Sequence, residues 1–378
     1  MKQLMLGNEA IARGAWEAGV RVSSAYPGTP STEINENIAN YKEIYSEWAP
    51  NEKVAVEVAL GAAVSGARSM ACMKHVGLNV AADPFFTATY TGVNAGMVVV
   101  VADDPGMHSS QNEQDTRLLG RASHAPVLDP SSSQECKDFM KLAFELSEEY
   151  DTPVILRLTT RIAHARTLVE QEERVLPELR EYKKDIKKYV SMPANMIGRH
   201  KVVEAREARM AEDANNMPAL NRIEWADRKV GVVTSGAAYN YVKEAMPDAS
   251  VLKLGLAYPM PRKLIEEFAA GVETLYVIED MEPFYEDTIK SWGIPCSGKD
   301  KTGVQGELFM HKIEEKFLGA EPAGPMNTTD IPNRPPVLCP GCPHRGLYYV
   351  LGKLKLTVCS DIGCYTLGAL PPLSGVDT

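Results

Sequence analysis

The sequence predicts an α/β protein whose sheets are mainly parallel. Two observations carry this prediction. Short, continuously apolar runs of strand length alternate with segments of helical periodicity through residues 1–165, and the same alternation resumes at Lys229. Strands that are apolar on both faces are typical of parallel sheets covered by helices on both sides. With 378 residues, the chain is long enough for two or three such domains.

Turn and capping residues set the boundaries of the elements in the first 165 residues. Asn8 is the expected cap of the first helix, and Gly19 ends it. The first strand ends at Pro27, after which Ser31 or Thr32 caps a second helix. We expect helices over 8–18 and 54–67 and strands over 20–25, 68–73, 97–102 and 154–159.

The rest of the chain divides into four parts. Residues 166–228 include the charged stretch EQEERVLPELREYKKDIKKYV, and we expect them to form an exposed helical linker. Residues 229–318 form the second α/β unit, and residues 319–336, rich in Pro, Gly, Asn and Thr, form a second linker. Residues 337–378 are too few for an α/β domain, so we expect the chain to be a fragment that stops inside a third domain.

Composition and charge exclude several classes of protein. The chain is 44% hydrophobic and 24% charged, which is normal for a globular protein in water. Its net charge of −10 argues against nucleic-acid binding, since phosphates need basic partners. The first ten residues lack the apolar run of a signal peptide, and no segment has the ~20 apolar residues that span a bilayer. We therefore expect a cytoplasmic protein that contacts no membrane.

Five motifs follow one another along the chain in a fixed order. They are AYPGTPST (25–32), EVALGAAVSGAR (57–68), KHVGLNVAADP (74–84), CPGCPHRG (339–346) and DIGCYTLGALPP (361–372). Together they resemble the large subunits of indolepyruvate ferredoxin oxidoreductases, which are thiamine-diphosphate-dependent 2-oxoacid:ferredoxin oxidoreductases. The resemblance covers essentially the whole chain. It implies a thiamine-diphosphate-binding fold with a pyrimidine-binding domain at 1–165, a transketolase-C-like domain at 229–318 and the start of a diphosphate-binding domain at 337–378.

The resemblance also implies a reaction and its partners. An arylpyruvate such as indolepyruvate is oxidatively decarboxylated, coenzyme A takes the acyl group, and electrons pass through [4Fe–4S] clusters to ferredoxin. The family works with a small beta subunit, which implies a dimer of heterodimers. The family's Gly-Asp-Gly motif for Mg²⁺ and diphosphate, and its ferredoxin-like cysteine repeats, are absent from this sequence. We expect them beyond Thr378, and we expect the fragment alone to be inactive.

Glu57 is the predicted catalytic carboxylate. Thiamine enzymes need a carboxylate that shares a proton with the aminopyrimidine ring, and a dry, apolar setting strengthens that sharing. Val56 and Val58 flank Glu57 within a longer apolar stretch, whereas Glu52 stands in a polar stretch and is expected to be solvated. Without the resemblance, Glu57 would be interpreted as an exposed residue of an amphipathic helix.

The turn of Tyr26, Pro27, Gly28 and Thr29 follows a strand and opens a helix, where backbone donors and hydroxyls can hold an anion. The resemblance implies that this turn contacts the cofactor and that Thr29 faces the substrate. Related pyruvate enzymes carry a bulkier residue where this chain has Gly28, which predicts room here for an aromatic substrate. A plain Pro/Gly turn with a capping hydroxyl is the alternative.

Two more substrate-binding candidates follow later strands. Lys74 and His75 come directly after one strand, and the polar loop 103–117 follows another. Loops at strand ends carry function more often than average. We expect His75 to contact substrate or cofactor and Arg117 to pair with the substrate carboxylate, whose shape suits a guanidinium. Structural hydrogen bonding is the alternative for both residues.

Four of the seven cysteines lie in the last forty residues, which suggests metal or redox chemistry in a reducing compartment. Cys339-x-x-Cys342 with Cys364 suits thiolate ligation of an iron–sulfur cluster. A zinc ribbon that adds Cys359, or a purely structural role, are the alternatives. His344 is a weaker candidate for the same region.

Three other functions stay open. The chain could serve pyruvate or another 2-oxoacid within the same family. A non-redox thiamine decarboxylase would not need the cysteine cluster. A scaffold subunit without catalysis would explain the missing Mg²⁺ motif but not a carboxylate placed among apolar residues.

Overall fold

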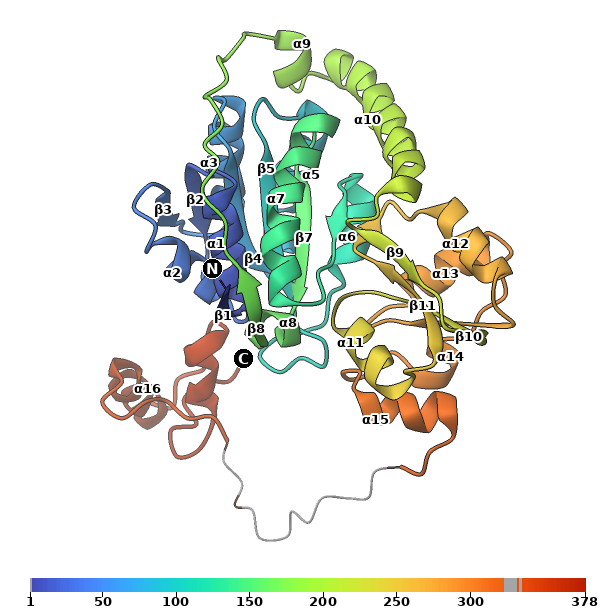
Figure 1. Ribbon diagram of the computed structural model, residues 1–378. Coiled ribbons are helices and arrows are strands. Elements are labelled where there is room, and N and C mark those ends of the chain that lie inside the picture. Colours follow the sequence, from blue (N-terminus) through green and yellow to red (C-terminus); the bar gives the residue numbers. More distant parts are fainter. Residues whose placement is uncertain (1, 323–331, 333–334) are drawn as a thin grey trace. The chain divides into compact units, whose positions relative to one another are not determined.

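The computed structural model describes residues 2–322, 332 and 335–378, which belong to two compact units divided at Pro322 (Figure 1). Most of the predicted linker 319–336 lies outside the described residues. Within the part that is described, no helix combines the length and the apolarity that crossing a membrane requires. The mixed α/β architecture with parallel sheets confirms the predicted fold class.

The first unit is built around a seven-stranded sheet in the order β12-β6-β7-β5-β4-β2-β3. Its neighbouring strands are parallel except for β12, which runs antiparallel to β6 at one edge. The strands are β2 (Val22–Ala25), β3 (Tyr45–Trp48), β4 (Ser69–Lys74), β5 (Met97–Asp103), β6 (Val127–Leu128), β7 (Val154–Thr159) and β12 (Leu256–Tyr258).

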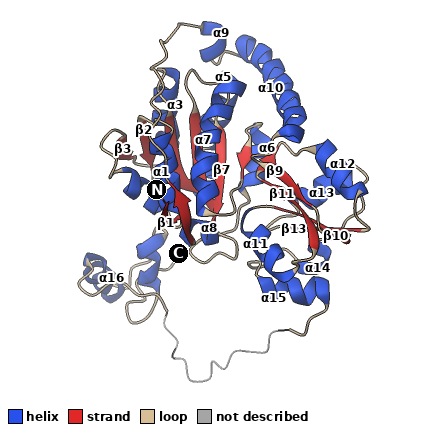
Figure 2. Ribbon diagram, in the orientation of Figure 1, coloured by secondary structure: helices blue, strands red, loops and turns tan. Residues whose placement is uncertain are grey.

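Helices cover both faces of this sheet, which explains why its central strands are apolar throughout (Figure 2). Val98 and Val100 of β5 pack into the core formed with α1 (Gly7–Glu17) and α7 (Ser133–Tyr150), while Val99 packs with helices on the other face. The helices of that other face include α3 (Glu52–Val64) and α5 (Ala82–Thr91). Shorter helices fill the connections: α2 (Thr32–Ile38), α4 (His75–Val80), α6 (Thr116–Ser123) and α8 (Thr160–His164).

A second, four-stranded sheet has the order β13-β10-β11-β9 and lies in the same compact unit. Its strands are β9 (Asn221–Glu224), β10 (Asp227–Thr234), β11 (Ala249–Leu254) and β13 (Thr274–Ile278). Its helices are α11 (Gly236–Ala245), α12 (Arg262–Ala270), α13 (Phe284–Ser291), α14 (Lys299–Thr302), α15 (Met310–Ile313) and a π-helical turn (Glu314–Leu318). Only Gly255 separates β11 from β12, so the chain passes directly from the second sheet to the first.

The predicted helical linker is only partly helical. Its first residues form β8 (Arg166–Glu170), which pairs antiparallel with β1 (Lys2–Leu6). Residues 171–185 are exposed as predicted but contain no helix, which corrects the interpretation of the charged stretch. Their polar groups bond instead to earlier parts of the chain: the Val175 N–H donates to the Glu17 carbonyl, and the Arg180 N–H donates to the Gly66 carbonyl. Helix forms only in α9 (Ile186–Tyr189), α10 (Pro193–Asp213) and a short 3-10 turn (Ala214–Asn216).

A buried ion network joins the two sheets. Arg117, on α6, forms ion pairs at 2.6 Å with Asp115 and with Glu279, which follows β13 of the second sheet. Arg157, on β7, pairs with Asp103 at 2.7 Å and with Asp129 at 3.0 Å. Because these six side chains are almost fully buried, each charge has lost its water and depends on its partner.

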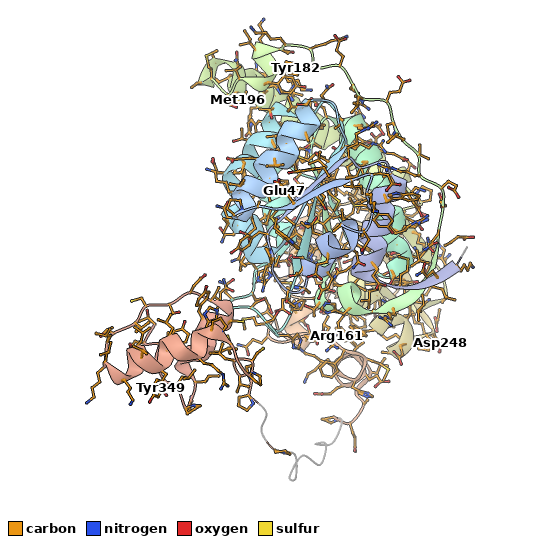
Figure 3. All side chains as sticks on the ribbon, turned by 90° about the vertical axis from the view of Figure 1, so that its left-hand side faces the viewer. Glu47, Arg161, Tyr182, Met196, Asp248 and Tyr349 are labelled. Atoms are coloured by element: carbon orange, nitrogen blue, oxygen red, sulfur yellow. The ribbon has the colours of Figure 1, made fainter. Side chains whose placement is uncertain are left out.

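The second unit is small. Its helix α16 (Pro343–Lys353) packs on a 3-10 helix (Gly363–Ala369), where the Tyr348 ring lies against Gly368. The Tyr348 hydroxyl hydrogen-bonds the Ser360 hydroxyl at 2.9 Å. Leu347, Tyr349, Val350 and other apolar side chains of the unit are exposed, Tyr349 being visible in Figure 3.

Substituting Arg117→Met should destabilise the first unit by about 3 to 5 kcal/mol, because it leaves the buried carboxylates of Asp115 and Glu279 without an ion pair. Urea unfolding followed by tryptophan fluorescence measures this change. The control is Arg262→Met, which removes an exposed pair with Glu266 and should change stability by less than about 1 kcal/mol. An equal loss of unfolding free energy in both variants would mean that the buried network stabilises the fold no more than an exposed ion pair does.

Candidate active site

The carboxyl ends of β5, β4 and β2 lie side by side at one edge of the first sheet, so the segments that follow them meet there. These segments are the turn at 26–29, the start of α4 at His75 and the loop at 104–115. Helix α8, with Arg161, follows β7 at the same edge, whereas Tyr182 lies at the opposite end of the unit in Figure 3. We call this edge the carboxyl-edge site.

The turn after β2 is open to solvent. Tyr26, Pro27 and Thr29 are exposed there. The Gly28 carbonyl accepts hydrogen bonds from the N–H and hydroxyl of Ser31, both at 2.8 Å. The Gly28 N–H donates to Thr32 Oγ1 at 2.9 Å, so this donor is already used within the turn. Ser31 is the N-cap of α2 as predicted, although its hydroxyl makes no capping bond.

The space beside Gly28 is occupied by the side chain of Lys74. A Cβ atom placed on Gly28 would stand 3.1 Å from Lys74 Cδ and 3.2 Å from its Cγ. Lys74 Nζ donates a hydrogen bond to the Ser109 carbonyl at 3.0 Å. Gly28 therefore makes room for a lysine of the same chain, and the predicted room for an aromatic substrate is not found at this position.

Asp104 organises the loop next to Lys74. Its carboxylate accepts hydrogen bonds from the Ser109 N–H (2.8 Å), the Ser110 hydroxyl (2.7 Å) and the Thr160 hydroxyl (2.8 Å). Burial raises the pKa of Asp104, but these hydrogen bonds outweigh it, so the net pKa is lowered. For the lysine the effect of burial has the opposite sign: it lowers the pKa of Lys74, and the charge of Asp104 opposes this change.

His75 is fully buried at the start of α4. Its Nε2 lies 3.0 Å from the Asn112 carbonyl of the neighbouring loop. Its Nδ1 has no hydrogen-bond partner within the described chain. His75 therefore anchors the loop, and one ring nitrogen is left for another group.

Glu57 does not have the predicted burial. Its side chain is half exposed and lies 4.0 Å from Lys53. The buried face of α3 is formed by Glu52, Ala55, Val56, Ala59 and Ala63, which recur at helical spacing. Glu57 stands about 100° away from Val56 around the helix, so its apolar neighbours in sequence are not its neighbours in space.

Glu52 occupies the environment that was predicted for Glu57. It opens α3 after the cap Asn51, whose side chain accepts the Val54 N–H at 3.0 Å, and it is 8% exposed. A Cβ on Gly77 would stand 2.7 Å from Glu52 Oε1, so the carboxylate lies against the start of α4. Burial raises the pKa of Glu52, opposed by a hydrogen bond from its own backbone. No other residue in the described ranges donates to this carboxylate. Two features of the sequence predict the burial of Glu52: the capping asparagine Asn51 and the helical spacing of the apolar residues of α3.

Arg117 is not free to bind a substrate. It is 1% exposed, and besides its two ion pairs it donates to the Asp280 carbonyl at 2.8 Å and to the Glu282 carbonyl at 3.1 Å. Every nitrogen of the guanidinium has a protein acceptor. The predicted pairing with a substrate carboxylate is therefore wrong, and Arg117 is a structural residue.

The cysteines of the last segment belong to the second unit. Cys339 and Cys364 are exposed, Cys342 is partly buried, and all seven cysteines of the chain are free. The Cys342 N–H donates to the Cys339 carbonyl at 3.1 Å, and the ring of His344 lies 4.6 Å from that of Tyr365. Among the residues that the structure describes, no three His, Cys, Asp or Glu side chains group as metal ligands.

Comparison with known proteins identifies relatives. The model of a family described as pyruvate flavodoxin/ferredoxin oxidoreductase, thiamine diphosphate-binding, matches residues 13–231. The chain is 45% identical to indolepyruvate oxidoreductase subunit IorA of Pyrococcus abyssi and to that of Thermococcus kodakarensis, with 99% of this chain covered in both alignments. It spans 63% of the length of these relatives.

A solved structure shows the same fold. The 2-oxoglutarate:ferredoxin oxidoreductase from Magnetococcus marinus, solved with 2-oxoglutarate, coenzyme A and succinyl-CoA bound, aligns with a TM-score of 0.69. The alignment covers 83% of this chain and 65% of that one, at 18% sequence identity. A split-gene transketolase aligns with a TM-score of 0.52 at 14% identity.

The raised pKa of Glu52 predicts how Glu52→Gln changes stability with pH. Well below the ordinary pKa of 4.5 the carboxyl is protonated in both folded and unfolded chains, so variant and wild type should be equally stable. As the pH rises through the raised pKa of the folded state, the wild type loses stability because a buried carboxyl must ionise. We expect the cofactor-free variant to melt at a higher temperature than wild type near neutral pH.

The matched control for this melting experiment is Glu57→Gln, whose carboxylate is half exposed. It should melt together with the wild type at every pH. If Glu52→Gln also melted with the wild type near neutral pH, the ionised Glu52 would not be destabilising and its burial would carry no energetic consequence.

Proposed function

Because the chain belongs to the thiamine-diphosphate-binding pyruvate flavodoxin/ferredoxin oxidoreductase family, we propose that it supplies the pyrimidine-binding side of the active site in an arylpyruvate:ferredoxin oxidoreductase. The substrate class comes from the relatives named indolepyruvate oxidoreductase subunit IorA, and ferredoxin as acceptor comes from the Magnetococcus marinus enzyme. The domain division 1–165, 229–318 and 337–378 is part of this proposal. So are coenzyme A as acyl acceptor, a small beta subunit and a dimer of heterodimers.

The single observation that carries the proposal is the buried carboxylate of Glu52 at the carboxyl-edge site. A thiamine enzyme needs a carboxylate that is held in a dry place and is free to accept a proton-sharing bond from the cofactor. Glu52 meets both requirements, since it is 8% exposed and bonds only to its own backbone within the described chain. We therefore propose Glu52 for the role that the resemblance implies for Glu57, and the assay below distinguishes the two carboxylates.

Thiamine diphosphate, when bound, supplies the carbon nucleophile that attacks the 2-oxo group of the substrate. Glu52 would hold the aminopyrimidine by sharing a proton at its carboxylate. Tyr26 and Thr29, exposed on the neighbouring turn, would contact the cofactor and substrate, and His75 would offer its free Nδ1. Mg²⁺ with the diphosphate would be held by residues outside this sequence, which lacks the Gly-Asp-Gly motif.

Substituting Glu52→Gln in the complete enzyme with its partner subunit should lower indolepyruvate-dependent ferredoxin reduction by about 100-fold or more, because an amide cannot share that proton. Glu57→Gln is the matched control and should stay near the wild-type rate. The reverse pattern would restore Glu57 as the catalytic carboxylate. Full activity in both variants would remove the pyrimidine-binding role from α3.

The same assay tests the substrate class. The wild-type enzyme should show a higher kcat/KM for indolepyruvate than for pyruvate, as the names of the relatives suggest. A preference for pyruvate would move the protein to another branch of the family. Aldehyde and carbon dioxide formed without any reduction of ferredoxin would instead identify a non-redox decarboxylase.

We also propose that Cys339, Cys342 and Cys364 ligate a [4Fe–4S] cluster, with a fourth cysteine outside this sequence. Free thiols on one small unit support this, and free cysteines throughout agree with a cytoplasmic location. Anaerobic reconstitution of the complete enzyme should give fewer iron atoms per chain for Cys342→Ser than for wild type. Cys359→Ser is the control, and a loss of iron in that variant instead would make Cys359 a cluster ligand. Zinc without iron in the wild-type protein would favour a zinc ribbon.

A further inference from the structure

Lys74 is a buried cation without a direct ion pair, although the charge of Asp104 acts on it from a greater distance. Its side chain is 8% exposed and lies at the carboxyl end of β4, directly before His75 and α4. Its one hydrogen bond goes to a neutral acceptor, the Ser109 carbonyl. No carboxylate of the described residues lies within 4 Å of its ammonium. An ammonium carries three donors, so two remain for another group.

The nearby carboxylate of Asp104 does not fill this gap. Its oxygens already accept four hydrogen bonds, from the N–H and hydroxyl of Ser109 and from the hydroxyls of Ser110 and Thr160. Other buried lysines in this chain are neutralised directly: Lys137 pairs with Glu17 at 3.3 Å, and Lys253 pairs with Glu135. A buried charge without a partner is costly, so Lys74 stands apart from the pattern of the rest of the fold.

The position of Lys74 is set by two neighbours at the carboxyl-edge site. Gly28 leaves the space that the lysine stem fills, with only 3.1 Å between a Cβ at that position and Lys74 Cδ. Ser109 holds the ammonium from the other side, and its own hydroxyl donates to the Thr29 carbonyl at 3.4 Å. Lys74 is thus held between the turn predicted to face the substrate and the loop after β5.

We propose that Lys74 binds the carboxylate of the 2-oxoacid substrate, and that Gly28 is present to admit this lysine. The proposal rests on the proposed function and deepens it, because it names the residue that recognises the acid group. Arg117, the residue predicted to pair with the substrate carboxylate, already forms ion pairs with Asp115 and Glu279 and cannot take this role. An ammonium with two spare donors suits a carboxylate, which accepts through two oxygens.

The test uses the complete enzyme with its partner subunit and two substrate analogues as competitive inhibitors. Indole-3-propionate carries a carboxylate, and indole-3-propionamide carries a neutral amide of similar shape in its place. In Lys74→Met, the inhibition constant of the acid should rise about 10- to 100-fold, as expected for a lost charge-assisted hydrogen bond. That of the amide should stay unchanged. Lys74→Arg, which keeps the charge, should restore part of the affinity for the acid.

Two further variants keep the test decisive. Gly28→Ala places a methyl group against the lysine stem without removing any charge. It should weaken the binding of the acid inhibitor but not that of the amide. Lys229→Met, an exposed lysine of the second sheet, is the matched control and should leave both constants unchanged. If Lys74→Met fails to assemble, the Arg and Gly28→Ala variants decide the question.

Three results would overturn the proposal. Equal weakening of acid and amide would make Lys74 a purely structural support of the loop. Unchanged constants would place the carboxylate elsewhere. A weaker affinity for thiamine diphosphate with unchanged inhibitor binding would assign the lysine to a cofactor phosphate. A wild-type enzyme that neither turns over 2-oxoacids nor binds the acid inhibitor would refute the proposed function itself, which is a separate outcome.

Discussion

The buried ion network of Arg117 and Arg157 is the constraint on which the carboxyl-edge site depends. Desolvated charges tolerate little movement, because each must keep its partner. The loop after β5 begins next to Asp103 and ends at Asp115, and both carboxylates belong to this network. The Thr116 N–H also donates to Asp103 at 3.1 Å. The loop that contacts Lys74 and His75 is thus fixed at both ends, and through Glu279 its position is tied to the second sheet.

The carboxyl-edge site differs from the network in its ion pairing, since its buried residues Glu52 and Lys74 form no ion pair with another described residue. Glu52 lies against Gly77 and Lys74 lies against Gly28, so that each charged side chain fills the space that a glycine leaves. In both groups burial shifts the pKa toward the neutral form. Such unpaired groups reduce stability, and they persist where function requires them. The ion network is paired throughout, whereas Glu52 and Lys74 form no ion pair, and our proposals assign the cofactor and substrate contacts to these two residues.

The sequence was sufficient for the sheet, but it did not reveal which charged side chains near the predicted site are buried. Strands such as β5 and β7 were predictable because burial on both faces makes them apolar throughout. The resemblance implies Glu57, and its apolar neighbours in sequence predict burial, but the helix turns those neighbours to another face. The structural role of Arg117 could not be predicted, because its partner Glu279 is 162 residues away in the sequence. The charge pattern of residues 171–185 predicts a helix, yet their backbone bonds to distant residues such as Glu17 and Gly66.

The central claim is that Glu52 is the carboxylate that engages the cofactor at the carboxyl edge of the first sheet. The most direct measurement is a structure of the complete enzyme, with its partner subunit and thiamine diphosphate bound. We expect an oxygen of Glu52 within about 2.6 to 3.2 Å of a ring nitrogen of the aminopyrimidine. An aminopyrimidine that contacts Glu57 instead, or a Glu52 carboxylate that still faces only protein, would contradict the account.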